Sequence, residues 1–512
     1  MTKAQRFLIL AILLLVVPVL VWMFVLSKLH GIPPTHKLAF FKFAFVKTMK
    51  LEDWRLMAAF LLSFPVTFIF AKFGGLLDDP GFQGKGFKRF LRGTKIVTKN
   101  KLAELTRERK KEQVTIGGVP IPIKIETLHF LLNGSTGAGK SVTLREMVNC
   151  IIKRGDRLII VDPDADMFSR FGKKGDILLN PYDKRTQGWS VFNEIKADFD
   201  YRNFCGSMVP PAADKSAEEW NGYARVILES SMRVLKQEAG TQTPSMDEVT
   251  RLATIVDVPT MKKKLQGTNA ESMFVQGADK ALGSARFVLN NRLPIFKEMP
   301  QGDFSIRDFL ANGTGNIYIT WREDQATALK PIISAWIDII CSAMLSLEED
   351  SNRSMWLFLD ELASMDKIKS LVDALTKGRR KGLRVVAGIQ SISQLKDIYG
   401  KEAATILMSC FRSLIVMGGS KTDAETSEEM SKALGEHEVI RDNKNRSSGG
   451  GKTSVSKSEQ VQRERVILPS EISSLPELTG IISFAGDYPI CRFKSEYVNY
   501  EKKNKPFVDM DY

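Results

Sequence analysis

The chain begins with a long apolar segment. Phe7 to Leu26 contains 20 residues without a charge, and a helix that rises about 1.5 Å per residue crosses a hydrocarbon layer of about 30 Å over this length. A cleaved signal peptide is the alternative, but its apolar core is normally about 7–15 residues long and ends at a small-residue cleavage site. No such site follows Leu26. We therefore predict a transmembrane helix.

A second apolar segment, Leu56 to Ala71, has 16 residues and contains Pro65. On length alone it also fits a buried core helix. Its flanks favour a membrane span, because Trp54 precedes it and Lys72 follows it. Aromatic and basic side chains at such positions lie at membrane interfaces and extend the usable length to about 20 residues. We predict a second span here.

Short apolar runs bounded by polar residues occur later and alternate with helical patterns. Runs of this kind indicate buried strands, and their alternation with helices indicates a parallel sheet that is covered on both faces. The runs are Leu158 to Asp162, Met355 to Leu359, Arg384 to Gln390 and Ser413 to Gly418. The pattern predicts an α/β domain.

Strand signals stop between about Gln187 and Ile306. Ala217 to Gln237 carries apolar residues at helical spacing, and Pro244 to Glu248 opens a helix with a capping box. This interval predicts an all-α domain inserted into the α/β domain. The predicted divisions are an anchor at 1–73 with spans at about 7–26 and 54–73, a basic juxtamembrane segment at 74–112, the α/β domain at 113–186 and 307–512, and the inserted all-α domain at 187–306.

Positive charge gathers at the amino end of the chain. The net charge is +14, and residues 1–112 contain 20 of the Lys and Arg residues against seven Asp and Glu. The remaining 400 residues are therefore nearly neutral. Basic residues next to a membrane attract anionic lipid, so the total charge predicts contact with membrane lipid and is weak support for DNA binding.

Cysteine and histidine restrict the chemistry. The five cysteines are scattered and form no CxxC pair, and the four histidines show no metal-binding spacing. The cysteine pattern indicates a reducing compartment. A metalloenzyme with a His or Cys ligand set is not expected.

A glycine-rich segment lies between a strand-like run and a helical pattern. The eight residues that fit GxxxxGK[ST] are Gly134, Ser135, Thr136, Gly137, Ala138, Gly139, Lys140 and Ser141. Backbone N–H groups of such a loop surround phosphates, and the helix N-terminus adds a positive dipole. We expect Lys140 to bind the β- and γ-phosphates of ATP and Ser141 to bind Mg²⁺. A glycine-rich turn without a ligand is the alternative, which the flanking strand and helix disfavour.

A similar segment near the C-terminus is not assigned to nucleotide. Gly449 to Thr453 resembles the same motif, but Arg446 stands where the first glycine belongs and no strand pattern precedes it. We predict that the polar stretch Asn443 to Gln460 is a flexible surface loop.

Two carboxylates, Asp360 and Glu361, end the apolar run Met355 to Leu359. In a nucleotide site Asp360 would reach Mg²⁺ through water, and Glu361 would polarise the water that attacks the γ-phosphate. An acidic pair that caps the next helix is the alternative.

Further polar positions lie close by in the sequence. Gln390 ends an apolar strand, where a γ-phosphate sensor would lie, although a plain strand-end amide fits as well. Arg379 and Arg380 lie between the acidic strand and this strand. Charge runs are usually solvated, but an arginine finger from a neighbouring subunit stabilises transition-state charge. A finger that acts in this way implies a ring.

Together these segments resemble the type IV secretion coupling proteins of bacterial conjugation. The resemblance covers nearly the whole chain. It rests on the two N-terminal spans, GSTGAGKS, LIIVDPDADM at 158–167, the helical insertion, WLFLDE, and LTKGRRKGLRVVAGIQSISQL at 375–395.

The resemblance implies a RecA-like P-loop ATPase domain that forms a homo-hexamer around a channel and uses ATP and Mg²⁺. It implies Gln390 as sensor and Arg379 as finger, with Arg380 as the alternative. The implied partners are single- and double-stranded DNA bound without sequence preference, a relaxase with relaxosome accessory proteins, and components of a type IV secretion channel.

The expected location is the bacterial inner membrane. Residues 28–55 contain six basic and two acidic residues, so the positive-inside rule discriminates poorly. The ATPase domain needs cytoplasmic nucleotide, and we therefore expect both termini in the cytoplasm and the loop 28–53 in the periplasm.

Two rival functions are compatible with a membrane-anchored P-loop ATPase. A septal-type chromosome DNA translocase would need more N-terminal spans and a C-terminal winged helix, and the last 50 residues offer no recognition helix. A coupling ATPase that exports only proteins stays open, because the motor region, residues 113–512, is nearly neutral.

Overall fold

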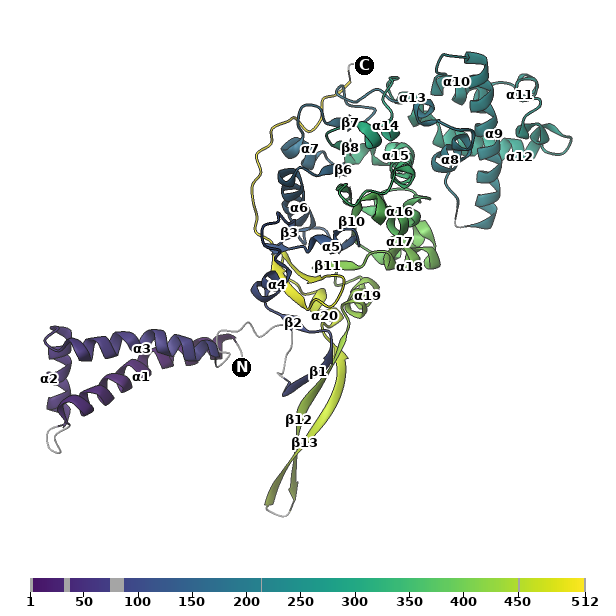
Figure 1. Ribbon diagram of the computed structural model, residues 1–512. Coiled ribbons are helices and arrows are strands. Elements are labelled where there is room, and N and C mark those ends of the chain that lie inside the picture. Colours follow the sequence, from purple (N-terminus) through teal and green to yellow (C-terminus); the bar gives the residue numbers. More distant parts are fainter. Residues whose placement is uncertain (1–2, 32–36, 74–86, 213, 450–451, 511–512) are drawn as a thin grey trace. The chain divides into compact units, whose positions relative to one another are not determined.

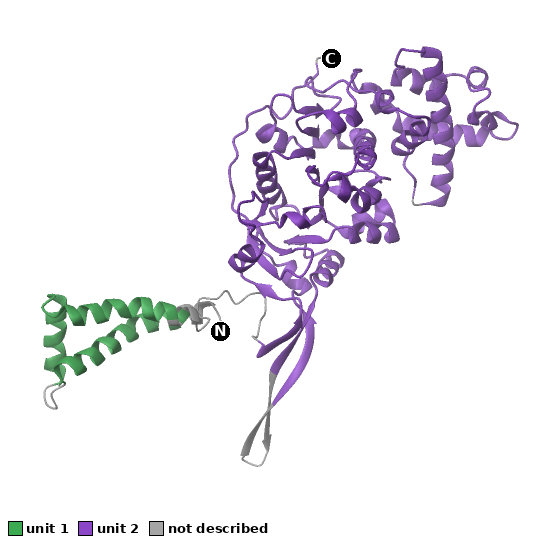
Figure 2. Cartoon of the chain, viewed as in Figure 1, with its two compact units in different colours: residues 1–86 green, residues 87–512 purple. Residues whose placement is uncertain are grey.

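The computed structural model describes residues 3–31, 37–73, 87–212, 214–449 and 452–510. The chain forms two compact units, residues 1–86 and residues 87–512, and each is described by itself (Figure 2).

The first unit is helical. Its helices are α1 (Lys3–His30), α2 (Lys37–Met49) and α3 (Trp54–Phe73), and α1 and α3 pack side by side (Figure 1). Trp22 packs with Leu26 and Leu56 in a small core, and its indole Nε1 donates to Thr48 Oγ1 at 3.0 Å. The interval 28–53, which we predicted as a loop between the two spans, contains the helix α2.

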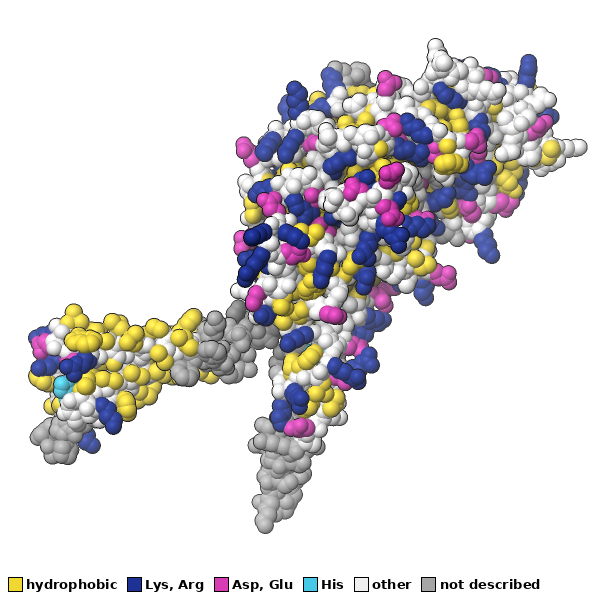
Figure 3. Space-filling view, in the orientation of Figure 1, with side chains coloured by type: hydrophobic (Ala, Val, Ile, Leu, Met, Phe, Trp, Pro, Cys, Tyr) yellow, Lys and Arg dark blue, Asp and Glu magenta, His cyan; other side chains and the backbone are white. Residues whose placement is uncertain are grey.

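Apolar side chains cover the outside of this unit, as Figure 3 shows. Leu8–His30 has a mean hydropathy of 3.2 and only 11% of its most apolar window is buried, so it is long and apolar enough to cross a membrane. Trp54–Ile69 is a shorter apolar helix. A third helical segment, Glu323–Ser346, is long enough but less apolar, with a mean hydropathy of 1.6, and 72% of its most apolar window is buried inside the second unit, as in a core helix.

A ten-stranded sheet organises the second unit. Its order is β2-β15-β14-β11-β5-β10-β9-β6-β8-β7. The seven strands from β11 to β7 are parallel, β14 runs antiparallel to both of its neighbours, and β15 pairs in parallel with β2. The strands are β2 (Ile96–Val97), β5 (Phe130–Asn133), β6 (Arg157–Pro163), β7 (Ile177–Leu179), β8 (Ile317–Trp321), β9 (Met355–Leu359), β10 (Leu383–Ile389), β11 (Ser413–Met417), β14 (Thr479–Ser483) and β15 (Ile490–Lys494).

Every predicted strand is present, and the predicted parallel sheet forms the centre of a mixed one. All residues of β5, β8, β9 and β10 are buried, which explains their continuous apolar runs. On one face, Trp356 and Phe358 belong to the same core as Met147 and Ile151 of α6 (Lys140–Arg154). On the other face Leu357 is buried as well, so both faces of the sheet are covered.

Helices fill the interval that we predicted as an all-α insertion. They are α8 (Asp198–Met208), α9 (Lys215–Ala239), α10 (Met246–Thr250), a π-helix (Arg251–Ile255), α11 (Val258–Lys264), a 3-10 helix (Asn269–Phe274), α12 (Asp279–Arg292) and α13 (Pro294–Glu298). The predicted capping box is confirmed, because Ser245 Oγ accepts from the backbone of Glu248 at 3.2 Å and Glu248 accepts from the backbone of Ser245 at 2.7 Å.

A long hairpin stands where we predicted a flexible loop, so that prediction is wrong. Strands β12 (Glu436–Gly449) and β13 (Lys452–Arg465) pair along 14 residues each, and β1 (Arg89–Gly93) adds a third strand. Gly450 and Gly451 lie outside the described residues. Backbone hydrogen bonds build this ribbon. Its sequence is mostly polar and gives no sustained alternating apolar signal, although His437 and Val439 at its base are buried. Gly93 has a φ of 101°, and an added Cβ would lie 2.3 Å from Glu436 O.

The last part of the chain, residues 495–509, has no helix or strand and is called the C-terminal strap below. It passes along α6 and α7 (Asp166–Phe171) toward β7 (Figure 1). Asn504 donates through its side chain to the carbonyls of Phe168 and Gly172, and Val508 N donates to the buried carboxylate of Asp183 at 3.0 Å. These bonds hold the strap against the body of the second unit.

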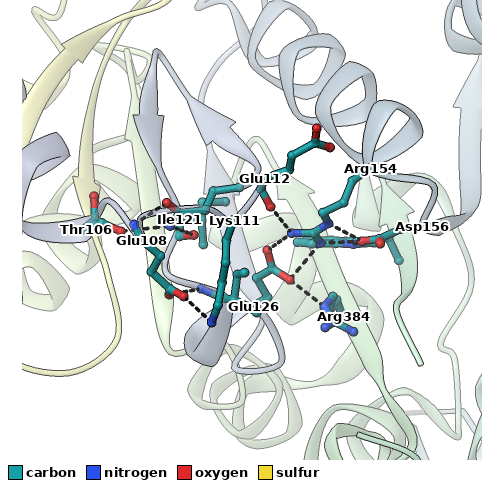
Figure 4. A network of polar contacts seen from close by, with 12 residues as sticks. Thr106, Glu108, Lys111, Glu112, Ile121, Glu126, Arg154, Asp156 and Arg384 are labelled. Atoms are coloured by element: carbon teal, nitrogen blue, oxygen red, sulfur yellow. Dashed lines mark hydrogen bonds and ion pairs between the residues drawn. The ribbon is translucent and has the colours of Figure 1, made fainter. Parts of the chain in front are cut away.

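A buried ionic network joins the amino ends of three central strands. Figure 4 shows Glu126 between two guanidinium groups: Arg154 donates to it at 2.7 and 3.0 Å, and Arg384 at 2.9 Å. Asp156 accepts from Arg154 and from the indole of Trp356. Since the Glu126 carboxylate is fully buried, its two cations offset the cost of removing it from water.

Candidate functional site

The glycine-rich loop connects β5 to the N-terminus of α6, as predicted. Ser135 connects the loop to the end of the neighbouring strand β11: its backbone N and its Oγ donate to Gly418 O at 2.9 and 2.8 Å. Gly134 N donates to Ile389 O at 3.2 Å. Gly137 and Gly139 have φ values of 80° and 104°, a region that side-chain-bearing residues rarely adopt. The loop is therefore held from both sides while its tip turns sharply.

Lys140 and the acidic pair meet across the sheet. β10 separates β5 from β9, and Lys140 Nζ donates to Glu361 Oε2 at 2.9 Å just beyond the carboxyl end of β9. The other Glu361 oxygen is buried and has no hydrogen-bond partner among the described residues. Asp360 is partly buried, and desolvation raises the pKa of its carboxyl despite the nearby ammonium of Lys140.

Gln390 lies between the loop and the acidic pair. It follows β10, and Thr136 Oγ1 donates to its Oε1 at 3.2 Å. A cavity of about 500 Å³ brings these groups together. Of the predicted site residues, those that line it are Ser135, Thr136, Gly137, Gly139, Lys140, Ser141, Asp360, Glu361 and Gln390.

A nearby carboxylate on β6 was not assigned a role from the sequence. Asp162 is buried and accepts from the backbone of Met167 at 3.0 Å and of Phe168 at 2.7 Å. Burial raises the pKa of Asp162 to about 8, although these two hydrogen bonds act in the opposite direction. The contacts give Asp162 a structural role at the start of α7.

Arg379 lies apart from this cavity. It belongs to a 3-10 turn (Gly378–Lys381) and lines a second cavity of about 570 Å³ with Lys124, Arg412 and Tyr488. Arg380 points elsewhere, with its guanidinium 3.7 Å from the carboxylate of Glu349, and both side chains are exposed. The two neighbouring arginines are therefore in different surroundings.

The cavity also contains residues that the sequence analysis did not identify. They are Val142, Arg145, Glu477, Leu478 and Tyr497. Glu477 and Leu478 precede β14, and Tyr497 belongs to the C-terminal strap. Val142 and Arg145 lie on α6 just beyond the glycine-rich motif. No local motif marks the other three, because they reach the loop only through the turn before β14 and the strap.

The oxygen donors in the cavity suit a hard cation. A serine hydroxyl and carboxylates, as supplied by Ser141, Asp360 and Glu361, are typical ligands of Mg²⁺, which usually completes its shell with water and phosphate. Glu361 keeps one buried oxygen without a partner among the described residues, which can accept a hydrogen bond from water of this shell. Among the described residues, no group of three or more His, Cys, Asp and Glu forms a closed metal site.

A sheet with a glycine-rich loop at the end of β5 and an acidic pair two strands away defines a RecA-like P-loop domain. The model of a family described as the type IV secretion-system coupling protein DNA-binding domain matches residues 113–496. The chain belongs to this family, and the resemblance seen in its sequence is confirmed.

Two relatives illustrate the match. The coupling protein TraD of Escherichia coli (strain K12) is 28% identical over 421 residues, which cover 80% of this chain and 58% of TraD. The chain thus spans just over half the length of this curated relative. The solved structure of the bacterial conjugative coupling protein TrwBdeltaN70 matches with a TM-score of 0.79 and 50% sequence identity. The match covers 84% of this chain and 99% of the TrwBdeltaN70 chain.

Further TrwB structures contain nucleotides. Its complexes with a non-hydrolysable ATP analogue, with ADP and Mg²⁺, and with a non-hydrolysable GTP analogue each match with a TM-score of 0.78 and identities of 49–50%. Each covers 84% of this chain and 100% of the TrwB chain.

Proposed function

We propose that this chain is an ATP-hydrolysing coupling protein that links a relaxase–DNA complex to a type IV secretion channel and drives DNA transfer in conjugation. The observation that carries the proposal is the cavity in which Lys140, the Asp360–Glu361 pair and Gln390 meet at the glycine-rich loop. Membership of the coupling-protein family supports the biological setting.

The proposed roles follow from the donor types. Backbone amides of the loop from Gly134 to Gly139, Ala138 included, surround the phosphates. Ser141 and Asp360 hold Mg²⁺, which neutralises phosphate charge. Gln390 senses the γ-phosphate next to Thr136. TrwB binds analogues of both ATP and GTP, and we extend this acceptance of both purine triphosphates to the present chain.

Lys140 and Glu361 form an exchange pair in this mechanism. In the structure the ammonium is bound to the carboxylate at 2.9 Å. Phosphates that enter the loop compete for Lys140, because an ammonium group binds a polyanion more strongly than a single carboxylate. Glu361 is then free to accept a proton from the attacking water, as a general base does. Nucleotide binding itself would thereby activate the base.

Arg379 is proposed as a finger for the neighbouring subunit of a homo-hexamer. Its absence from the lining of its own nucleotide cavity supports action in trans, and the cations Lys124 and Arg412 share its cavity. Arg380, at the carboxylate of Glu349, is the weaker candidate.

The remaining proposals concern location and partners. The first unit, with spans at about 7–26 and 54–73, anchors the chain in the inner membrane and contacts lipid, with both termini cytoplasmic and 28–53 periplasmic. The juxtamembrane segment 74–112 leads to the motor at 113–186 and 307–512. DNA of either strandedness, the relaxase with its accessory proteins and the channel are the proposed partners, and the domain at 187–306 has no assigned role.

ATP hydrolysis by the full chain in detergent, measured with and without single- and double-stranded DNA across a salt series, tests this function. We expect DNA to stimulate hydrolysis and the duplex binding constant to fall with salt at a log–log slope of about −0.9 per phosphate contact. Lys140→Ala should abolish turnover, whereas Lys174→Ala, at an exposed lysine outside the cavity, should not. Hydrolysis without DNA binding at low salt would instead favour the protein-exporting coupling ATPase.

A further inference from the structure

The nucleotide cavity has two chemically different ends. Lys140, Glu361 and Gln390 form one end, on the side of β10 and β9. Glu477, Leu478 and Tyr497 form the other end, on the side of β11 and β14, which lie across β5 from β10. Lys140 and the amides of the glycine-rich loop attract a triphosphate to the first end, whereas Glu477, Leu478 and Tyr497 supply no cation that would bind it. The nucleoside part of a bound nucleotide therefore belongs there.

Leu478 ties this second end to the glycine-rich loop. Its backbone N donates to Ala138 O at 3.0 Å. Its side chain packs so closely on Gly139 that an added Cβ there would lie 2.8 Å from a Leu478 methyl group. The turn before β14 is therefore in contact with the point where the loop becomes α6.

Tyr497 is held in place by its neighbours on both sides. Ser495 is buried; its backbone N donates to Leu478 O at 2.8 Å, and its hydroxyl lies 3.0 Å from Thr143 Oγ1 on α6. Three residues beyond Tyr497, the ring of Tyr500 packs on Phe171 with centroids 5.1 Å apart. The Tyr497 side chain itself is 65% exposed and lines the cavity. An exposed aromatic ring on an anchored backbone is prepared to stack against a planar ligand.

We infer that Tyr497 is the stacking platform for the nucleobase of the bound purine nucleotide. The inference rests on the proposed nucleotide function and deepens it. The other groups at this end include the apolar side chains of Val142 and Leu478, so the base is bound through its face. Stacking tolerates every base, because each has a π-face. A platform of this kind accepts adenine and guanine alike, in keeping with the proposed use of both triphosphates.

Binding measurements with three ligands test the inference on the full chain in detergent. The ligands are ATP, GTP and inorganic tripolyphosphate, which lacks a base, and the variants are Tyr497→Ala and Tyr497→Phe. We expect Tyr497→Ala to bind ATP and GTP about tenfold or more weakly, the usual scale for loss of base–aromatic stacking, and to bind tripolyphosphate as the wild type does. Tyr497→Phe should restore the nucleotide affinities. Phe287→Ala, at an exposed aromatic residue of α12, is the matched control and should bind all three ligands normally.

The possible outcomes separate the two proposals. Unchanged ATP affinity in Tyr497→Ala would overturn the platform and leave the ATPase proposal intact. Equal weakening of ATP and tripolyphosphate would also overturn it, because the residue would then shape the phosphate end. If the wild-type chain bound none of the three ligands, the proposed function itself would fail.

Discussion

The ammonium of Lys140 and the carboxylate of Glu361 are largely buried, with 10% and 17% of their side chains exposed. Removing one partner from such a pair leaves the other charge without compensation, at a cost of several kcal/mol. Each residue therefore stabilises the other until a ligand offers Lys140 a stronger partner. At the residue scale, the loop proposed to bind phosphate and the carboxylate proposed to activate water are already joined.

Glu361→Gln separates binding from hydrolysis. The amide has the size of the carboxylate but no charge and no basicity, so Lys140 is released to phosphate while the general base is lost. We expect ATP affinity to stay the same or rise, and turnover to fall by about 10²–10⁴-fold. Equilibrium binding and steady-state hydrolysis on the same preparation measure both. A weaker ATP affinity together with normal turnover would contradict the exchange mechanism.

The predictable part of the site is the part that lies in contiguous motifs. The glycine-rich loop with Lys140 is one contiguous motif, and the two acids after an apolar run are another. Each could be recognised from neighbouring residues in the sequence alone. Tyr497 could not be identified in this way, because its place in the cavity depends on bonds such as that between Ser495 and Leu478. The sequence also could not separate Arg379 from Arg380, since their difference lies in what surrounds each side chain.

At the scale of elements, His129 connects two strands and one helix of the second unit. It immediately precedes β5, with a φ of 61°. Its ring lies 2.8 Å from Leu375 O on α16 (Leu371–Lys377), and Val385 N of β10 donates to its Nδ1 at 3.1 Å. The neutral imidazole that carries its proton on Nε2 satisfies both bonds, because Nε2 then donates to Leu375 O and Nδ1 accepts from Val385 N. The strand that leads to the phosphate loop is thereby connected to the helix that leads to Arg379.

Burial of His129 predicts a pH dependence of stability. Burial lowers the pKa of its imidazole from 6.5 to about 4, with the charges of Arg379 and Arg384 adding to the effect. The unfolded chain takes up this proton near pH 6.5, so the stability contribution is complete above pH 6.5 and is lost as the pH falls toward 4.

His129→Asn removes that titration while its short amide tolerates the left-handed backbone. Between pH 7 and pH 4 the wild type should lose about 3 kcal/mol more unfolding free energy than the variant. Urea unfolding at a series of pH values measures the difference, since titrating carboxylates affect both chains alike. Parallel pH profiles would show that the imidazole does not titrate as expected.

A buried face made several elements predictable, but not all of them: β8 is fully buried and was not predicted. The central strands carry continuous apolar runs because helices cover both sides, and α9 shows the expected helical spacing. β12 and β13 are mostly polar in sequence, and although His437 and Val439 are buried at their base, the apolar positions are too few to form an alternating pattern. β14 and β15 also escaped prediction, although both are largely buried; the reversed direction of β14 between β11 and β15 is a tertiary feature.

At the scale of the whole molecule, the two cavities are the basis of the proposed ring. One holds the phosphate loop and the acidic pair, and the other holds Arg379 with two further cations. A single chain does not bring the two together. A closed ring repeats one contact between neighbours, and such a contact can place the second cavity of one subunit at the first cavity of the next.

Mixing experiments with Arg379→Ala test this arrangement. Alone, the variant should hydrolyse ATP about 10³-fold or more slowly, the scale of a lost arginine finger, while its own ATP affinity is preserved. In mixtures with wild type, activity should fall more steeply than the wild-type fraction. Arg380→Ala, which removes only an exposed contact with Glu349, is the matched control. Activity that falls in proportion to the wild-type fraction would contradict action in trans.

The attachment of β1 to the hairpin determines how the second unit bears tension from the segment before it. β1 runs antiparallel to β12, from Arg89 opposite Ile440 to Gly93 opposite His437, and Arg92 forms an ion pair with Glu438. A force on the preceding chain that is directed along β1 would load the hydrogen bonds between β1 and β12 together in shear. No single bond would then break before the others. Tension in the preceding segment would thus be transmitted to the second unit through several backbone hydrogen bonds at once.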